Sequence, residues 1–138
     1  MPDKKPMDKP GRGIIRVAVV DDDKALLSVF SALMKHAEYH THFFSKPQRA
    51  LDEITAVKGH YHLVITDFNM PDMNGIHFAK RLRTAEPQLP IILMSGELLS
   101  EEVRAQTALM GRIAILEKPF GLNTVLDDFI PKFLRGEA

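Results

Sequence analysis

Short apolar runs alternate with longer amphipathic segments through most of this chain, and that alternation restricts its fold more than any other feature. The apolar runs are about four to seven residues long, and the segments between them are roughly 12 to 15 residues long with helical spacing of their apolar positions. A strand–helix repeat of this kind is typical of βαβ units around a parallel sheet. The sequence therefore predicts an α/β fold, and its 138 residues fit a single domain.

Five strands and five helices are expected from this pattern. The strands are expected over residues 14–20, 40–44, 61–66, 90–94 and 113–116, and the helices over residues 26–37, 47–57, 76–85, 98–110 and 122–134. Pro47 suits a first helical turn, and Gly111 can cap the helix before it. Pro131 removes a backbone donor inside the last helix, which predicts a kink there or an end near Ile130.

Polar side chains stand where four of the apolar runs end. Asp21 and Asp22 follow the first run, Asp67 follows the run over residues 61–66, Ser95 follows Met94, and Lys118 comes soon after Leu116. Side chains at the carboxyl ends of neighbouring parallel strands converge on one crevice. Three acids, a hydroxyl and a lysine in one crevice predict a site for a divalent cation and a phosphoryl group.

Each of these residues also has an ordinary structural interpretation. Asp23 is expected to cap the helix that follows it, but mutual repulsion between Asp21 and Asp22 requires an offsetting charge, and Mg²⁺ accepts such oxygen ligands. Asp67 could simply cap a turn, or it could attack phosphorus to form an aspartyl phosphate. Alone, Lys118 and Ser95 would be unremarkable loop residues; together with the acids they can screen and hydrogen-bond a phosphoryl group.

The segments that carry these residues resemble the receiver domain of bacterial two-component response regulators. They are Val-Val-Asp-Asp-Asp ending at Asp23, Thr-Asp-Phe-Asn-Met-Pro-Asp-Met-Asn-Gly over 66–75, Leu-Met-Ser-Gly over 93–96 and Lys-Pro-Phe over 118–120. The resemblance extends over about residues 14–135, in an organisation similar to the stand-alone receivers of chemotaxis. It implies a flavodoxin-like (βα)₅ fold with a five-stranded parallel sheet in the order 2-1-3-4-5.

The resemblance also implies a role for each site residue. Asp67 would be the phosphoacceptor, and Asp21, Asp22 and Asp67 would hold Mg²⁺ with the backbone carbonyl of Asn69. Ser95 would be the hydroxyl switch residue, Lys118 would contact the phosphate, and the Lys118–Pro119 bond would be cis. Four positions are expected to modulate the lifetime or the switch: Asn69, Gly96, Glu97 and Ile115. The chain departs from the family at Ile115, where many receivers carry Tyr or Phe.

The resemblance further implies the partners. A sensor histidine kinase, a phosphotransfer protein or a small phosphodonor would supply the phosphoryl group in the cytoplasm. The surface over residues 98–110, 113–116 and 122–134 would then contact a downstream partner, of a kind that the sequence does not identify, or a second copy of the chain. No output domain is expected after the last helix. The protein would be no enzyme beyond its own phosphorylation and dephosphorylation.

Composition excludes several other classes. Lys plus Arg and Asp plus Glu both number 18, so no overall positive charge favours direct contact with nucleic acid. No apolar run reaches the ~20 residues of a membrane-spanning helix, and the absence of cysteine excludes disulfides. The histidines have no zinc-ligand spacing and are expected at the surface or at strand edges. Residues 1–13, with three prolines, are expected to be a flexible tail, and residues 14–138 the receiver domain.

Two alternatives remain open at this point. A haloacid-dehalogenase-type phosphatase also begins with a strand followed by Asp-x-Asp, which Asp21 to Asp23 satisfy, although Ala25 replaces the Thr or Val expected there. A receiver-like adaptor could instead bind its partners without phosphorylation, although Asp67, Ser95 and Lys118 are all intact.

Overall fold

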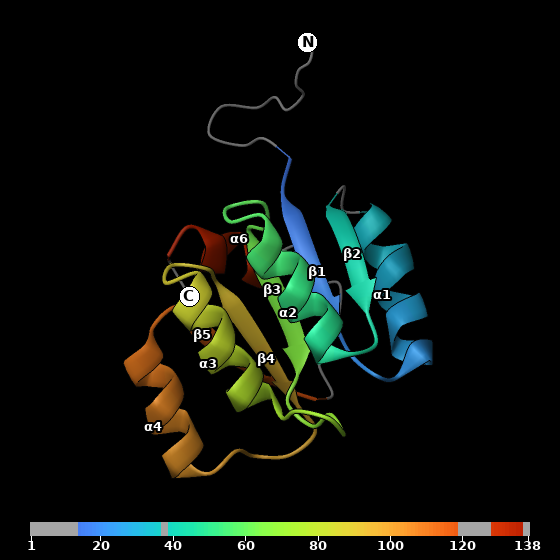
Figure 1. The fold of residues 1–138 in the computed structure, drawn as a ribbon. Coiled ribbons are helices and arrows are strands. Elements are labelled where there is room, and N and C mark those ends of the chain that lie inside the picture. Colours follow the sequence, from blue (N-terminus) through green and yellow to red (C-terminus); the bar gives the residue numbers. More distant parts are fainter. Residues whose placement is uncertain (1–13, 37–38, 119–127, 137–138) are drawn as a thin grey trace.

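Five parallel strands form a sheet at the centre of the molecule, with helices packed on both of its faces (Figure 1). The structure is a computed structural model, and it describes residues 14–36, 39–118 and 128–136. The strands are β1 (Arg16–Val20), β2 (His40–Phe44), β3 (Leu63–Asp67), β4 (Ile91–Ser95) and β5 (Ile113–Glu117). Their order is β2-β1-β3-β4-β5, which confirms the expected flavodoxin-like arrangement.

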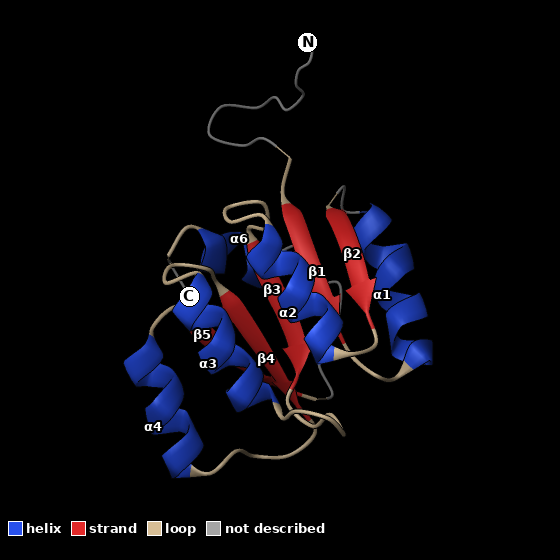
Figure 2. Cartoon of the chain, viewed as in Figure 1, coloured by secondary structure: helices blue, strands red, loops and turns tan. Residues whose placement is uncertain are grey.

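The helices divide between the two faces of the sheet (Figure 2). They are α1 (Lys24–His36), α2 (Pro47–Ala56), α3 (Gly75–Ala85), α4 (Glu101–Met110) and α6 (Ile130–Leu134). Residues of α2 and α3 pack on one face of the strands, and residues of α1 and α6 pack on the other. Pro47 occupies the first turn of α2, and Gly111 follows α4 with a φ of 76°, as expected.

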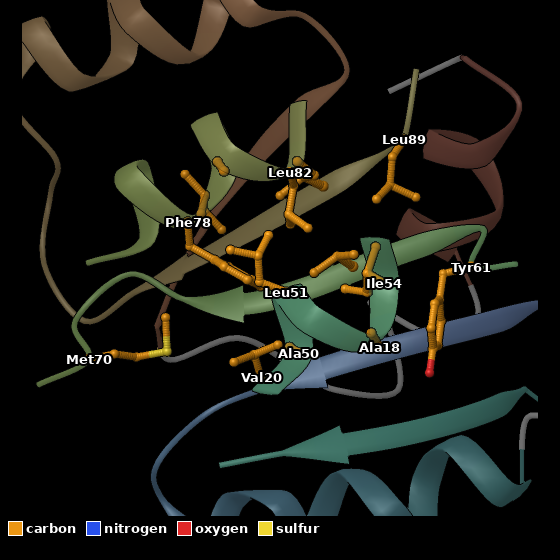
Figure 3. Packing of buried hydrophobic residues seen from close by; sticks show 14 residues of the cluster. Ala18, Val20, Ala50, Leu51, Ile54, Tyr61, Met70, Phe78, Leu82 and Leu89 are labelled. Atoms are coloured by element: carbon orange, nitrogen blue, oxygen red, sulfur yellow. The ribbon is translucent and has the colours of Figure 1, made fainter. Parts of the chain in front are cut away.

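Two hydrophobic clusters form the core, one on each face of the sheet. Successive residues of β1 alternate between them, because side chains along a strand point to opposite faces: Ala18 and Val20 belong to one cluster, and Val17 and Val19 to the other. Figure 3 shows the first cluster, in which Phe78 and Leu82 from α3 and Ile54 from α2 cover β1, β3 and β4. The central strands are buried on both faces, which explains why they read as continuous apolar runs.

Several predicted boundaries are wrong by one to three residues. β1 begins at Arg16 rather than residue 14, and β3 begins at Leu63 rather than residue 61. β3 and β4 include their polar ends, because Asp67 pairs with Met94 and Ser95 pairs with Glu117. The helix predicted from residue 98 begins at Glu101, because Ser100 Oγ accepts a hydrogen bond from Val103 N and caps it there.

Only the end of the last predicted helix is described. The α-helical segment α6 runs from Ile130 to Leu134 with Pro131 in its first turn. Most of the part before it lies outside the described residues, so the predicted kink or end near Ile130 stays a prediction. Residues 128 and 129 adopt a π-helical turn, so the irregularity comes just before the proline. The tail over residues 1–13 and most of the predicted helix over 122–134 lie outside the described residues. Among the described helices, none is both long enough and apolar enough to span a bilayer.

Candidate functional site

The carboxyl ends of β1 and β3 place two acids next to each other at one edge of the central sheet. These strands are hydrogen-bonded neighbours, with Val20 paired to Thr66. Asp67 is the last residue of β3 and Asp21 immediately follows β1, and their side chains are almost fully buried. The loops that leave β1, β3 and β4 gather at the same end of the sheet (Figure 1). The strand order therefore builds the acidic site that the sequence predicted.

Three carboxylates could share a cation at this position. Asp21, Asp22 and Asp67 each offer one oxygen, and these oxygens lie within 4.8 Å of one another. Asp21 and Asp67 are buried, whereas Asp22 is exposed, so the group opens to solvent on one side. This donor set fits a hard cation such as Mg²⁺, which takes one or two carboxylates and keeps several waters.

The third aspartate of the run has a different task. Asp23 Oδ1 accepts hydrogen bonds from Ala25 N at 3.0 Å and from Leu26 N at 3.2 Å, at the start of α1. Its own backbone N–H donates to Asp21 Oδ1 at 2.9 Å. The predicted capping role of Asp23 is thus confirmed, and the cap also holds Asp21 in place.

Burial disfavours the charged form of Asp21, so a nearby positive charge would stabilise it. Loss of solvation raises its pKa above the usual 3.8, the Asp23 N–H opposes that shift, and the charge of Asp67 adds to it. Asp21 Oδ2 is buried and has no hydrogen-bond partner. A buried carboxylate oxygen without a hydrogen bond is costly, so this atom is well suited to act as a ligand of a cation.

Lys118 supplies one positive charge from the end of β5. Its Nζ lies 2.9 Å from Asp67 Oδ1 and 3.9 Å from Asp21 Oδ2. Its backbone N–H donates to Ser95 O at 2.6 Å, which fixes the start of the loop after β5 against the end of β4. A single lysine between two buried acids leaves net negative charge, which again favours a bound cation.

Ser95 ends the strand next to Asp67, but its hydroxyl bonds the backbone of Glu97 and not the acidic site. The side chain is fully buried at the end of β4. Its Oγ donates to Glu97 O at 2.5 Å and accepts from Glu97 N at 3.2 Å. The hydroxyl is therefore committed to its own loop in this arrangement.

The four predicted modulating positions differ in their exposure to solvent. Asn69 and Glu97 are exposed, and Gly96 is exposed with open space where a Cβ would stand. Ile115 is half-buried on β5 and packs against the cluster on the α2–α3 face. Pro119 lies outside the described residues, so the predicted cis bond before it stays a prediction.

Two residues that help to shape the site were not predicted from the sequence. Gly75 N donates to Phe68 O at 2.7 Å, and an added Cβ would come within 2.8 Å of Phe68 Cα, so only glycine fits beside the loop after Asp67. The pair Asn74–Gly75 signalled a turn but not this close approach. Arg104 on α4 contacts Glu117, next to Lys118, and a surface arginine in a helix carries no distinguishing signal.

Comparison with known proteins agrees with this geometry. Residues 17–129 match the family model of the response regulator receiver domain. Chemotaxis protein CheY-3 of Vibrio cholerae is 29% identical over 117 residues, which cover 80% of this chain and 85% of that protein. The two-component response regulator ARR12 of Arabidopsis thaliana is 37% identical over 82 residues, 59% of this chain but only 14% of that protein. The chain thus spans a small part of such plant relatives.

Solved structures show the same fold. The chemotaxis protein CheY4 of Vibrio cholerae superposes with a TM-score of 0.72 at 26% identity, over 86% of this chain and 98% of that chain. A CheY-like receiver domain protein of Methanospirillum hungatei gives a TM-score of 0.78 at 22% identity, over 91% of this chain and 99% of that one. The second likeness concerns the fold alone.

Proposed function

The chain belongs to the response regulator receiver domain family, and we propose from this and from the site that Asp67 accepts a phosphoryl group in phosphorelay signalling. Receiver domains are regulators of two-component systems, not conventional enzymes. The observation that carries the proposal is the contact of Lys118 Nζ with Asp67 Oδ1 at 2.9 Å, beside Asp21 and Asp22. A buried carboxylate with a cationic neighbour at an open acidic site is equipped to meet a phosphate anion.

The reaction consists of one bond exchange at phosphorus. A carboxylate oxygen of Asp67 forms the new P–O bond as the donor's P–N bond, in a phosphohistidine, or P–O bond, in acetyl phosphate, breaks. Lys118 offsets the charge on the phosphoryl oxygens. Asp21, Asp22 and Asp67 would hold Mg²⁺ with the backbone carbonyl of Asn69, and the bound ion supplies charge neutralisation for the incoming phosphate.

The response would begin at Ser95. We infer that its hydroxyl exchanges the Glu97 carbonyl for a phosphoryl oxygen, which moves residues 96–99 and changes the surface formed by α4, β5 and α6. A sensor histidine kinase or a phosphotransfer protein in the cytoplasm would be the phosphodonor. A downstream protein, or a second copy of this chain, would contact that surface.

One observation disfavours a haloacid-dehalogenase-type phosphatase. In such a site the second acid of Asp-x-Asp must be available to the substrate, whereas the Asp23 carboxylate is held by Ala25 N and Leu26 N at the start of α1. The remaining alternative, an adaptor that needs no phosphorylation, predicts the same fold but no labelling.

Phosphodonor labelling tests the proposal. The full chain is incubated with acetyl phosphate or phosphoramidate in the presence of Mg²⁺, and the modified peptide is identified by mass spectrometry. We expect one phosphoryl group, on Asp67, and none in Asp67→Ala or in excess EDTA. Labelling that persists in either case contradicts the proposal, as does steady turnover of an aryl phosphate.

A further inference from the structure

Arg104 joins three parts of the molecule that meet beside the proposed phosphorylation site. Its Nε donates to Leu99 O at 3.1 Å, and a terminal guanidinium nitrogen lies 2.8 Å from Glu117 Oε2. Leu99 lies near the end of the loop that follows Ser95, next to the Ser100 cap of α4, and Glu117 immediately precedes Lys118. From these contacts we propose that the Arg104 bridge, defined as Arg104 with Leu99 O and Glu117, is a positioning device that stabilises the unphosphorylated arrangement of the loop. The inference rests on the proposed phosphorylation of Asp67.

The loop between β4 and α4 is held at both of its ends. At the start, the Ser95 hydroxyl bonds both the carbonyl and the N–H of Glu97. At the end, the Leu99 side chain is buried and its carbonyl accepts from Arg104. Between these two attachments lies Leu98, which is 73% exposed. A movement of Ser95 toward a phosphoryl group releases the first attachment, and the proposed displacement of residues 96–99 requires the second one to break as well.

The second attachment matters because α4 is otherwise weakly anchored. Thr107 is the only buried residue of this helix, and Leu109, on its surface, is 88% exposed. Few apolar contacts oppose a displacement of such an element. The guanidinium therefore adds a polar contact between α4 and the end of β5 where buried apolar contacts are few.

The direction of the effect follows from where these contacts exist. Contacts formed in only one of two arrangements favour that arrangement by their free energy. The arginine and the glutamate are 41% and 47% exposed, so the bridge is a modest bias rather than a lock. Breaking it should make the phosphorylated arrangement easier to reach, even though it removes contacts.

The test compares the affinity of the full chain for beryllofluoride, a phosphoryl mimic, in Mg²⁺ buffer. The sequence contains no tryptophan, so isothermal titration calorimetry is preferable to intrinsic fluorescence. We expect Arg104→Gln to bind beryllofluoride about two- to fivefold more tightly than wild type. Arg104→Lys keeps a charge near Glu117 but lacks the planar fork that reaches Leu99 O as well, so we expect an intermediate affinity. Arg81→Gln, at an exposed arginine on α3, is the matched control and should match wild type.

A second measurement follows the loop without any phosphoryl mimic. Amide hydrogen exchange of residues 96–100 should be about two- to fivefold faster in Arg104→Gln than in Arg81→Gln. Glu117→Gln removes only the ion pair and should show part of both effects, which covers the case in which Arg104→Gln folds poorly.

The outcomes separate the two proposals. A wild-type chain that binds no beryllofluoride overturns the proposed function and this inference with it. Wild-type binding together with equal or weaker binding in Arg104→Gln overturns the inference alone, and so does exchange over residues 96–100 that is the same in all variants.

Discussion

Lys118 Nζ lies 2.9 Å from Asp67 Oδ1, although the two residues are 51 positions apart in the sequence. The contact depends on the parallel pairing of β3 with β4 and of β4 with β5, which brings the ends of the three strands together. A positive charge is thus in place before any phosphate arrives, and the site does not have to reorganise to receive one.

Substitution of Lys118 should therefore slow phosphorylation rather than prevent folding. We expect Lys118→Gln to lower the rate of Asp67 labelling by acetyl phosphate by about 10²-fold, the usual effect of removing one preorganised stabilising group. Lys80→Gln, at an exposed lysine of α3, is the control. Labelling rates of Lys118→Gln that match this control would show that the contact has no part in the transfer.

Neutralising Asp21 should separate metal binding from stability. In EDTA, the free energy of unfolding of Asp21→Asn should exceed that of wild type by on the order of 1 kcal/mol, because the substitution removes a buried charge whose Oδ2 has no hydrogen bond. In wild type, Mg²⁺ at ten times its Kd should add about 1.4 kcal/mol, and the variant should lose most of this gain. Denaturant unfolding with and without Mg²⁺ measures both effects. An Asn variant that Mg²⁺ stabilises as much as wild type would remove Asp21 from the ligand set.

The difference in stability between wild type and Asp21→Asn should depend on pH in a defined direction. Burial raises the pKa of Asp21 above 3.8 in the folded chain, so between pH 3.8 and this raised pKa the folded state binds more protons than the unfolded state. Without metal, the contribution of Asp21 to stability therefore becomes unfavourable as pH rises from 3.8 through the raised pKa. The advantage of Asp21→Asn in EDTA should vanish at lower pH and reach its full size above the raised pKa.

Gly75 should be the least replaceable glycine near the site. An alanine Cβ would meet Phe68 Cα at 2.8 Å and Asp67 O at 3.1 Å, and both are backbone atoms that cannot turn away. Gly75→Ala should lower the free energy of unfolding by about 1–3 kcal/mol. Gly96→Ala, with nothing within 4 Å of its Cβ, is the matched control and should change stability by less than about 0.5 kcal/mol. Equal stability of the two variants would mean that the loop after Asp67 is free to shift.

The sequence was most informative where burial and strand pairing decide the structure. Apolar runs located β1, β3, β4 and β5, and the polar residues at their ends pointed to Asp21, Asp67 and Lys118, because parallel strands must bring these ends together. Exact boundaries depended on local hydrogen bonds, such as the Ser100 cap that delays α4 to Glu101. Ser100 followed by two acids is a pattern typical of a helix start, and the prediction of a helix from residue 98 did not take it into account.

Side-chain partners across the fold could not be predicted in the same way. The Ser95 hydroxyl bonds Glu97 and not the acidic site, and this depends on the Ser95 rotamer and on the path of the loop. The contacts of Arg104 depend on how α4 lies against β5, and many exposed helical arginines have no such contacts. Gly75 was recognised as part of a turn, whereas its distance from Phe68 follows only from the three-dimensional path.

The lifetime of the phosphorylated state should be short. Asn69 and Glu97 are both exposed and polar, and Gly96 leaves open space near the end of β4, so water can approach the acyl phosphate. Replacing both Asn69 and Glu97 with leucine should slow loss of the phosphoryl group by at least about tenfold, because the groups that orient a water are removed. Release of inorganic phosphate from the labelled protein measures the rate. A wild-type half-life of many hours in Mg²⁺ buffer, or no slowing in the double variant, contradicts this expectation.

The response to phosphorylation should depend on Ser95 much more than on Ile115. Isoleucine has a stiff first torsion and no polar tip, and Ile115 is already packed against the core cluster beside α3, so its rotation can change the surface by only a few methyl groups. Ser95, in contrast, holds the loop that leads to α4 through its bonds to Glu97. We expect Ile115→Ala to leave beryllofluoride-dependent partner affinity, or dimer fraction, within about twofold of wild type, at some cost in stability. Ser95→Ala should still be labelled on Asp67 but should lose most of the dependence of that affinity on beryllofluoride. A response abolished by Ile115→Ala and kept by Ser95→Ala would place the switch on β5 rather than in the loop after β4.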